Sequence, residues 1–269
     1  MVNNNRDRSR KYQQWASVLA IIAVLFIRNA SAEAIPVSSE SDRVLTERPL
    51  PGKVSATSDI YEINLVGLDL AELPGDLDEY RAVKVMHLGC NERMTRLPSY
   101  MGELLKMEEL DINNGNGCSM RLYIPERDSL PRNLRRLNLA GALAEGSRLD
   151  LTSLKWLEFL DISKLKSPQF PGSILKLKYL KDLRMNYMSL ESLPAQVGQL
   201  KNLENLYLNG NAISARSWPD LSGHASLKLV ELGNNSLTKI EQTLIRSRLP
   251  KTATVVFENL WDDSRANED

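Results

Sequence analysis

The chain has 269 residues, of which 42% are hydrophobic and 25% are charged, and this is an ordinary globular composition. Its length is enough for one large domain or two small ones. The formal net charge is zero, which argues against a general binder of nucleic acid or of anionic membranes.

The first 32 residues differ from the rest and predict a secretory signal peptide. Basic residues between positions 6 and 11 precede an apolar run, Trp15–Ile27, and the small residues Ala30, Ser31 and Ala32 follow it. The alternative is a retained membrane anchor, but a 13-residue helix spans about 20 Å and the hydrocarbon core of a bilayer is about 30 Å thick. We therefore predict cleavage after Ala32, an exported extracellular or periplasmic protein, and no membrane contact after cleavage.

A repeat of about 23 residues runs through the chain from residue 60 to residue 250. Its units start at positions 60, 83, 107, 134, 157, 180, 203 and 227. The shared spacing is L-x-x-L-x-L-x-x-N-x-L-x-x-L-P-x-x-L-x-x-L, which is clearest from Leu180 onward. One unit cannot bury its apolar residues alone, so the pattern predicts stacked units that share one continuous core.

This pattern resembles the leucine-rich-repeat family over about residues 60–250. The Leu193-Pro194 step, followed by Val197 and Leu200, is most similar to the class with 23-residue units that occurs in bacterial, plant intracellular and Ras-interacting proteins. The resemblance implies an α/β solenoid of about eight repeats. Such a solenoid is curved, with a parallel sheet inside and short helices or 3-10 turns outside.

Alternation of apolar and polar residues predicts one short strand in each unit. In the unit that starts at residue 180, Leu183 and Met185 alternate with Asp182, Arg184 and Asn186, which is typical of a strand with one buried face. The same frame predicts two solvent-facing columns along the sheet. The first column is Glu62, Val85, Glu109, Arg136, Phe159, Asp182, Asn205 and Leu229. The second is Asn64, His87, Asp111, Asn138, Asp161, Arg184, Tyr207 and Glu231.

The middle of these columns is the candidate binding surface. Its residues are Phe159, Asp161, Asp182, Arg184, Tyr187 and Tyr207. Aromatic residues and arginine are enriched at binding hot spots, so we predict a protein or peptide partner on the concave side of the sheet. The alternative is that these are ordinary strand residues that pair with their neighbours across the sheet.

Two features depart from the regular repeat. The asparagine at the bend after each strand is present at Asn91, Asn211 and Asn235, whereas other units carry an apolar residue there, which predicts a less regular bend. The unit that starts at residue 107 is the longest and carries an insertion, residues 113–118, that we expect to bulge from the rim.

The two ends of the repeat region need covering, because an exposed terminal repeat leaves apolar surface in water. Residues 33–59 show no repeat and predict a linker or an irregular N-terminal cap. Residues 251–261 predict a C-terminal cap in which Thr254–Phe257 adds a last strand and Trp261 covers the core. The charged residues 262–269 predict a disordered tail.

The cysteines and one sequon are candidate modification sites. Cys90 follows one predicted strand and Cys118 lies in the insertion, so a disulfide between them and two free thiols both stay open; a bridge needs Cα atoms within about 7 Å. One disulfide cannot form a scaffold, and a packed core must hold the fold together. Asn234 begins an Asn-Asn-Ser sequon, which predicts glycosylation only in a eukaryotic host.

No catalytic, metal or cofactor site is predicted. Histidine occurs only at His87 and His224, too few for a multi-histidine metal site. His87, Cys90 and Asp111 could be interpreted as base, nucleophile and orienting group, but no loop suited to stabilising an oxyanion is evident. An exposed histidine among polar neighbours is the better interpretation.

These observations predict an exported, non-enzymatic binding module that is a monomer and has no nucleic-acid partner. It could act as an effector, an adhesin or an inhibitor. The alternative is an envelope-associated or periplasmic structural repeat protein without a single high-affinity ligand, since repeat folds serve many purposes.

Overall fold

The computed structural model describes residues 62–73, 82–115, 117–124, 130–147 and 149–258. The predicted signal peptide (1–32), the linker or cap (33–59), Trp261 and the charged tail (262–269) lie outside the described residues. Among the described residues, no helix is long and apolar enough to cross a membrane.

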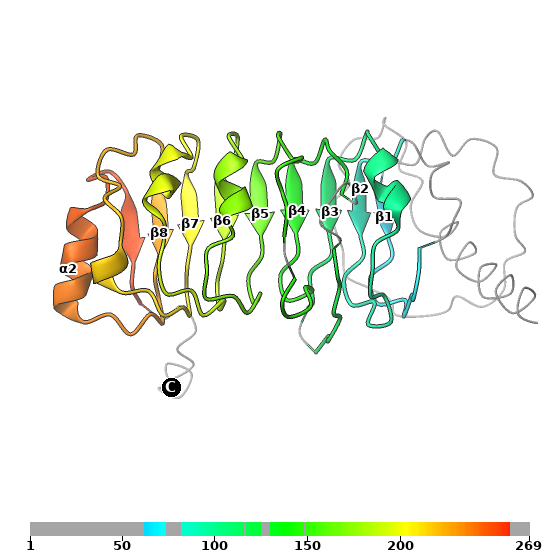
Figure 1. The fold of residues 1–269 in the computed structure, drawn as a ribbon, viewed down its shortest axis with the longest axis horizontal. Coiled ribbons are helices and arrows are strands. Elements are labelled where there is room, and N and C mark those ends of the chain that lie inside the picture. The colour runs from blue at the N-terminus through cyan, green and yellow to red at the C-terminus, as the bar shows by residue number, and fades with distance from the viewer. Residues whose placement is uncertain (1–61, 74–81, 116, 125–129, 148, 259–269) are drawn as a thin grey trace, which may run out of the picture.

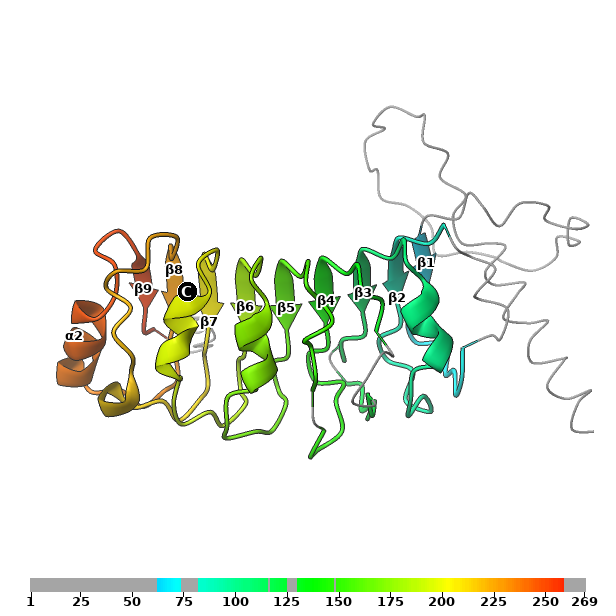
Figure 2. The same cartoon turned by 45° about the horizontal axis from the view of Figure 1, so that its top comes forward.

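Within the described residues, nine short parallel strands form one sheet, and their order in the sheet is their order in the chain. Figures 1 and 2 show them side by side in an elongated array. The strands are β1 (Glu62–Asn64), β2 (Val85–His87), β3 (Glu109–Asp111), β4 (Arg136–Asn138), β5 (Phe159–Asp161), β6 (Asp182–Arg184), β7 (Asn205–Tyr207), β8 (Leu229–Glu231) and β9 (Thr254–Val256).

The middle residue of each of the first eight strands is buried and stacks on its counterparts in the neighbouring strands. Leu160, for example, pairs with Leu137 on one side and Leu183 on the other, and all three are fully buried. The pairing confirms the predicted register, because every residue of each predicted solvent-facing column pairs with the next residue of the same column.

The chain returns from one strand to the next through turns and 3-10 helices. Their bounds are η3 (Ser99–Glu103), η4 (Gly172–Lys176), η5 (Ala195–Gln199) and η6 (Ala215–Ser217). The residue before each of the first three is a proline, namely Pro98, Pro171 and Pro194. Proline fixes φ near the helical value and has no N–H to lose, so it starts a short helix at little cost. The expected 3-10 turns on the return limb are therefore confirmed.

A helix and a last strand close the C-terminal end of the sheet. Helix α2 (Lys239–Ser247) begins with a capping box, in which Thr238 and Glu241 exchange side-chain and backbone hydrogen bonds. Ile245, a residue of this helix, is fully buried. Strand β9 pairs with β8, which confirms the predicted last strand.

Buried asparagines tie neighbouring repeats together at the bends. Asn211 donates to the carbonyls of Met185 and Leu208 and accepts from the N–H groups of Met188 and Leu190. Asn91 and Asn235 make equivalent bonds. The bend of the unit with Leu165 uses backbone bonds. The N–H of Leu165 donates to Ile162 and that of Ser167 to Met188.

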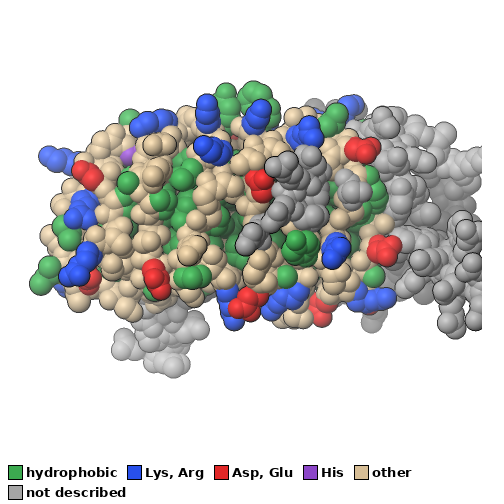
Figure 3. Space-filling view, viewed as in Figure 1, with side chains coloured by type: hydrophobic (Ala, Val, Ile, Leu, Met, Phe, Trp, Pro, Cys, Tyr) green, Lys and Arg blue, Asp and Glu red, His purple; other side chains and the backbone are tan. Residues whose placement is uncertain are grey.

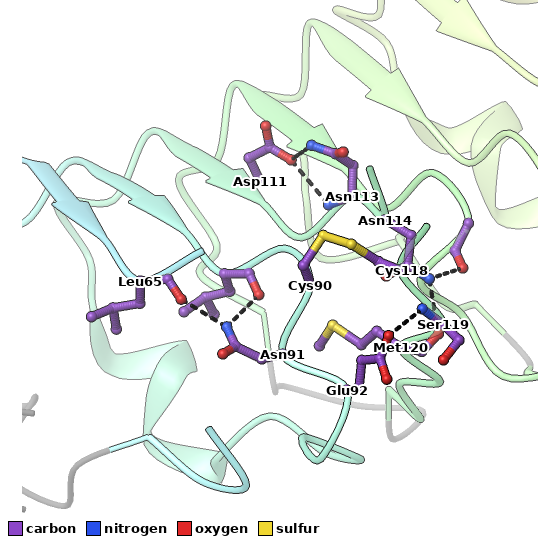
Figure 4. The surroundings of a disulfide bond; sticks show 12 residues. Leu65, Cys90, Asn91, Glu92, Asp111, Asn113, Asn114, Cys118, Ser119 and Met120 are labelled. Atoms are coloured by element: carbon purple, nitrogen blue, oxygen red, sulfur yellow. Dashed lines mark hydrogen bonds between the residues drawn. A yellow bond between two sulfur atoms is a disulfide. The ribbon is translucent and has the colours of Figure 1, made fainter. Parts of the chain in front are cut away.

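The insertion is exposed at its two glycines and anchored at both ends. Cys118 forms a disulfide with Cys90, with the Cα atoms 5.3 Å apart (Figure 4). Asn114 is buried and donates to the carbonyls of Met120 and Gly141, the second of which belongs to the next repeat. The N–H of Ser119 donates to Glu92 of the preceding repeat. The insertion therefore exposes two glycines to solvent and is fastened to repeats on both sides.

Candidate binding surface on the sheet

We call the solvent-facing side of β1–β9 the sheet face; it is formed by the first and third residues of each strand. These residues alternate with the buried middle residue, so they contribute little to the core and can differ from strand to strand. Neighbouring strands lie about 4.8 Å apart, which lets long side chains of successive strands contact one another.

Four side chains from β4–β7 form a continuous row on the sheet face. We call Arg136, Phe159, Arg184 and Tyr207 the arginine–aromatic row. The guanidinium of Arg184 lies 5.1 Å from the ring centre of Phe159 and 4.8 Å from that of Tyr207. The guanidinium of Arg136 lies 4.3 Å from the ring centre of Phe159. Each contact is a cation–π interaction that holds the arginine in a fixed direction.

Arg184 is the central group of this row. Its Nε is buried and has no hydrogen-bond partner among the described residues. An arginine held between two rings, with unused donor capacity, can bind a carboxylate or a carbonyl of another molecule without first breaking an ion pair. The sequence identified these residue types, but the position of Arg184 between the two rings depends on the lateral pairing of β5, β6 and β7.

Asp161 has a structural role and is not an exposed residue of the sheet face. It is 8% exposed, and its Oδ1 accepts from the backbone N–H of Ser163, two residues on. Asn64, Asp111 and Asn138 make the same bond at the same position of their own strands. Burial raises the pKa of the Asp161 carboxyl, and the hydrogen bonds from Ser163 oppose that rise. Asx residues at a strand end favour such turns, so the aspartate or asparagine at this position of the repeat is a sequence signal for the bond.

The structure places the other predicted surface residues at two positions. Asp182 is half-buried on the sheet face and accepts from the Asn205 side chain at 2.6 Å. Tyr187 lies in the bend after β6, has a left-handed φ of 57°, and is 45% exposed. Its ring occupies the space of a Gly210 side chain, so any larger residue at Gly210 would overlap it. Tyr187 is therefore a rim residue, and the strand-borne group is Phe159, Arg184 and Tyr207.

Acidic side chains surround the imidazole of His87 on the first strands. Its nitrogens lie 3.4 Å from a carboxylate oxygen of Glu62 and 3.8 Å from one of Asp111. Cys90, which the sequence analysis considered beside His87 and Asp111 as a nucleophile, is bonded to Cys118 and has no thiol to offer. The described residues contain no group of three or more side chains suited to a metal ion.

Comparisons with known proteins give a fold and no closer relationship. No protein-family model and no curated protein matches this sequence. Among solved structures, human 5T4 (Wnt-activated inhibitory factor 1, trophoblast glycoprotein) is 20% identical with a TM-score of 0.57, and the match covers 74% of this chain and 76% of that one. An internalin of Listeria monocytogenes is 15% identical with a TM-score of 0.50, over 75% of this chain and 62% of that one. The chain is a leucine-rich-repeat solenoid.

A third match is a leucine-rich-repeat protein of Leptospira interrogans, at 19% identity and a TM-score of 0.47. It covers 76% of this chain and 63% of that one, so this solenoid spans less than two thirds of the Leptospira chain. The parallel order of the nine strands and the 3-10 return limbs agree with the leucine-rich-repeat architecture that the sequence predicted.

The predicted glycosylation residue of this solenoid lies in the bend after β8. Asn234 is exposed and has a left-handed φ of 55°, and its neighbour Asn235 is one of the buried bend asparagines. An exposed asparagine in a bend is reachable by a modifying enzyme, so glycosylation at Asn234 stays a prediction that depends on the host.

Proposed function

We propose that this leucine-rich-repeat solenoid is an exported protein-binding module whose partner docks on the sheet face over β4–β7. The observation that carries the proposal is the position of Arg184 on the sheet face, where its guanidinium is held between the rings of Phe159 and Tyr207. Arginine and large aromatic residues dominate binding hot spots, because they bury much area and lose little conformational freedom when already ordered.

The partner is expected to present an acidic side chain or an exposed carbonyl to the guanidinium of Arg184. A rigid row of aromatic rings flanked by arginines suits a folded surface or an extended peptide that lies across neighbouring strands. Asp182 and Glu231 on the same face are each engaged with an asparagine side chain, so they are less available than Arg184 to a ligand.

The proposal of export rests on the N-terminal basic stretch, the apolar run and the small residues before position 33. Expression in a secreting host followed by N-terminal sequencing of the exported protein should read from Glu33. A retained N-terminus would instead favour an anchored protein.

Affinity capture with the exported protein as bait, followed by mass spectrometry, is the experiment that finds the partner. The double variant Phe159→Ala with Tyr207→Ala should weaken binding of that partner by at least about a hundredfold, which corresponds to about 2.7 kcal/mol for two hot-spot residues. Arg184→Ala should weaken it by a similar factor.

The matched control is Trp156→Ala with Tyr179→Ala. These rings are each about half exposed and stack on each other 5.2 Å apart, but they precede β5 and β6 and do not belong to the sheet face. Equal losses in the two double variants, with the fold intact, would remove the sheet face from the proposal. Failure to retain any partner, together with association with the cell envelope, would favour the structural role.

A further inference from the structure

A pocket lies beside the disulfide, at the bends that follow β3, β4 and β5. It is an open pocket of about 360 Å³, and we call it the exit-bend pocket. Three basic residues line it, Arg121, Lys164 and Lys166, and Glu145 is the acidic residue of its wall. The three basic residues come from two separate repeats, so the stacking of the solenoid brings their charges together.

Within the described part of the chain, the cations of this pocket form no ion pair with a carboxylate. Among the described residues no ion pair involves Arg121, Lys164 or Lys166, whereas on the strand-entry side the residues Lys84, Arg135, Lys181 and Lys228 are all paired with glutamates. Figure 3 shows lysine and arginine side chains along both long edges of the molecule. Convergent cations without an internal counter-charge favour an external anion.

The glycines of the pocket keep it open. Gly141 has a left-handed φ of 70°, and a Cβ there would lie 3.3 Å from Cβ of Asn114 and 3.5 Å from Cδ of Lys164. Gly115 and Gly117 form another part of the wall beside Cys118, which the disulfide fixes to the preceding repeat. The wall is therefore backbone held by a covalent bond and by the two carbonyls that Asn114 binds.

One polar atom in the wall lacks a partner. Asn114 lines the pocket and is 9% exposed, and its Nδ2 is fully used by two backbone carbonyls. Its Oδ1 is buried and accepts no hydrogen bond from any described residue. A buried acceptor without a donor costs free energy, and a ligand that brings a donor recovers it.

A pocket lined both by cations and by hydrogen-bond acceptors favours a ligand that carries both an anionic group and hydroxyl donors. We propose that the exit-bend pocket binds an acidic saccharide, a sugar ring with a carboxylate or a sulfate group. The anion faces Arg121, Lys164 and Lys166, and ring hydroxyls donate to Oδ1 of Asn114 and to the carboxylate of Glu145. A poly-acidic peptide suits the pocket less well, because the Glu145 carboxylate repels further negative charge and offers nothing but an acceptor.

Calorimetric titration of the exported protein tests this proposal with defined probes. These are a trimer of galacturonate, its methyl ester, a sulfated heparin disaccharide, hexaglutamate and inorganic sulfate. The expected result is binding of at least one acidic saccharide, with the neutral methyl ester, hexaglutamate and sulfate alone at least about tenfold weaker. The proposal is overturned if no acidic saccharide binds, if the methyl ester binds as well as the acid, or if hexaglutamate or sulfate binds as tightly as the best saccharide.

A charge-matched pair of variants locates the site. Lys164→Gln with Lys166→Gln should weaken the saccharide at least about tenfold, since it removes two of the three cations. Lys176→Gln with Lys178→Gln removes the same charge from exposed positions in and beside η4 and should leave the affinity unchanged. Equal weakening by both pairs overturns the proposal, because it would show a general charge effect. Thermal scans of all variants verify that the fold is kept.

Discussion

Leu183 and Arg184 are adjacent in β6, and their side chains point to opposite sides of the sheet. Leu183 is fully buried between Leu160 and Leu206, whereas Arg184 lies on the sheet face between two aromatic rings. The alternation of a strand makes neighbours in sequence belong to different environments, and the energetic consequences of substitution differ accordingly.

Leu183→Asp should therefore be far more destabilising than Arg184→Ala. A carboxylate in the stacked core has no partner and leaves the leucine's volume unfilled, so a loss of about 4 kcal/mol or more is expected. Arg184→Ala loses cation–π contacts worth less than about 1 kcal/mol each and no core packing. Thermal or urea unfolding measures both, and equal shifts would show that the strand register is wrong.

Asp161 shows how one residue couples the fold to pH. Burial raises the pKa of its carboxyl, so the folded protein holds this proton more tightly than the unfolded chain does. Ionisation of Asp161 therefore lowers stability, and this loss is relieved as the pH falls through the raised pKa. An asparagine at position 161 would keep the Oδ1 acceptor for the N–H of Ser163. Asn138 makes the corresponding bond, to the N–H of Ala140, in the preceding strand.

Asp161→Asn should accordingly unfold at the same temperature as the native protein or a higher one at pH 7 to 8. The advantage should shrink as the pH falls toward the range in which Asp161 is protonated. Asp161→Ala removes the acceptor and should lose about 1 kcal/mol. Unfolding curves at several pH values measure both effects, and an advantage of Asp161→Asn that grows at low pH would contradict the expected sign.

The insertion of the third repeat is the element that departs most from the regular unit. It is held by the Cys90–Cys118 disulfide, by Asn114 and by the bond from Ser119 to Glu92 (Figure 4). The two cysteines are 28 residues apart in sequence, so the bond closes a loop of about one repeat in the unfolded chain.

Cys90→Ser with Cys118→Ser should destabilise the protein by about 2–4 kcal/mol, mostly by releasing this constraint on the unfolded chain. The reduced native protein is the control and should behave as the double variant does. Urea unfolding measures the difference, and identical midpoints for the oxidised and reduced forms would contradict the expectation.

The described residues form a one-dimensional stack, in which each of their strands pairs only with its neighbours in sequence. Stability in such a stack is a sum over repeats and their interfaces, so damage at one end should spread inward from that end. Helix α2 offers a matched pair of positions for this test, because Ile245 is fully buried and Ile240 is 82% exposed.

Ile245→Asp should open the C-terminal repeats while leaving the centre folded. Hydrogen exchange should show lost protection in β8 and β9 and retained protection in β3–β5. Ile240→Asp should change neither region. A uniform loss of protection along the whole sheet would show instead that the solenoid unfolds as one cooperative unit.

Much of this architecture was predictable because the repeat is a local pattern. Leu183 and its counterparts recur at fixed spacing, so the strand positions, the buried face and the solvent-facing columns could be assigned without coordinates. The short turn that begins after Pro194 and the last strand, β9, were predicted from local sequence patterns in the same way.

The candidate site was predictable in composition but not in arrangement. The columns identified Phe159, Arg184 and Tyr207, but not the cation–π sandwich or the structural role of Asp161. The exit-bend pocket was not predicted, since Asn114, Gly141 and Lys164 belong to three different repeats and look unremarkable in each.

The sequence by itself determined the leucine-rich-repeat fold and which strand residues lie on the sheet face, because both depend on the spacing of residues within one unit. Only the tertiary structure decided that Cys90 meets Cys118, that Arg184 lies between two rings, and that three basic residues share one pocket. Those contacts join residues one or two repeats apart in the chain. They depend on how the units stack, which the spacing of residues within one unit does not determine.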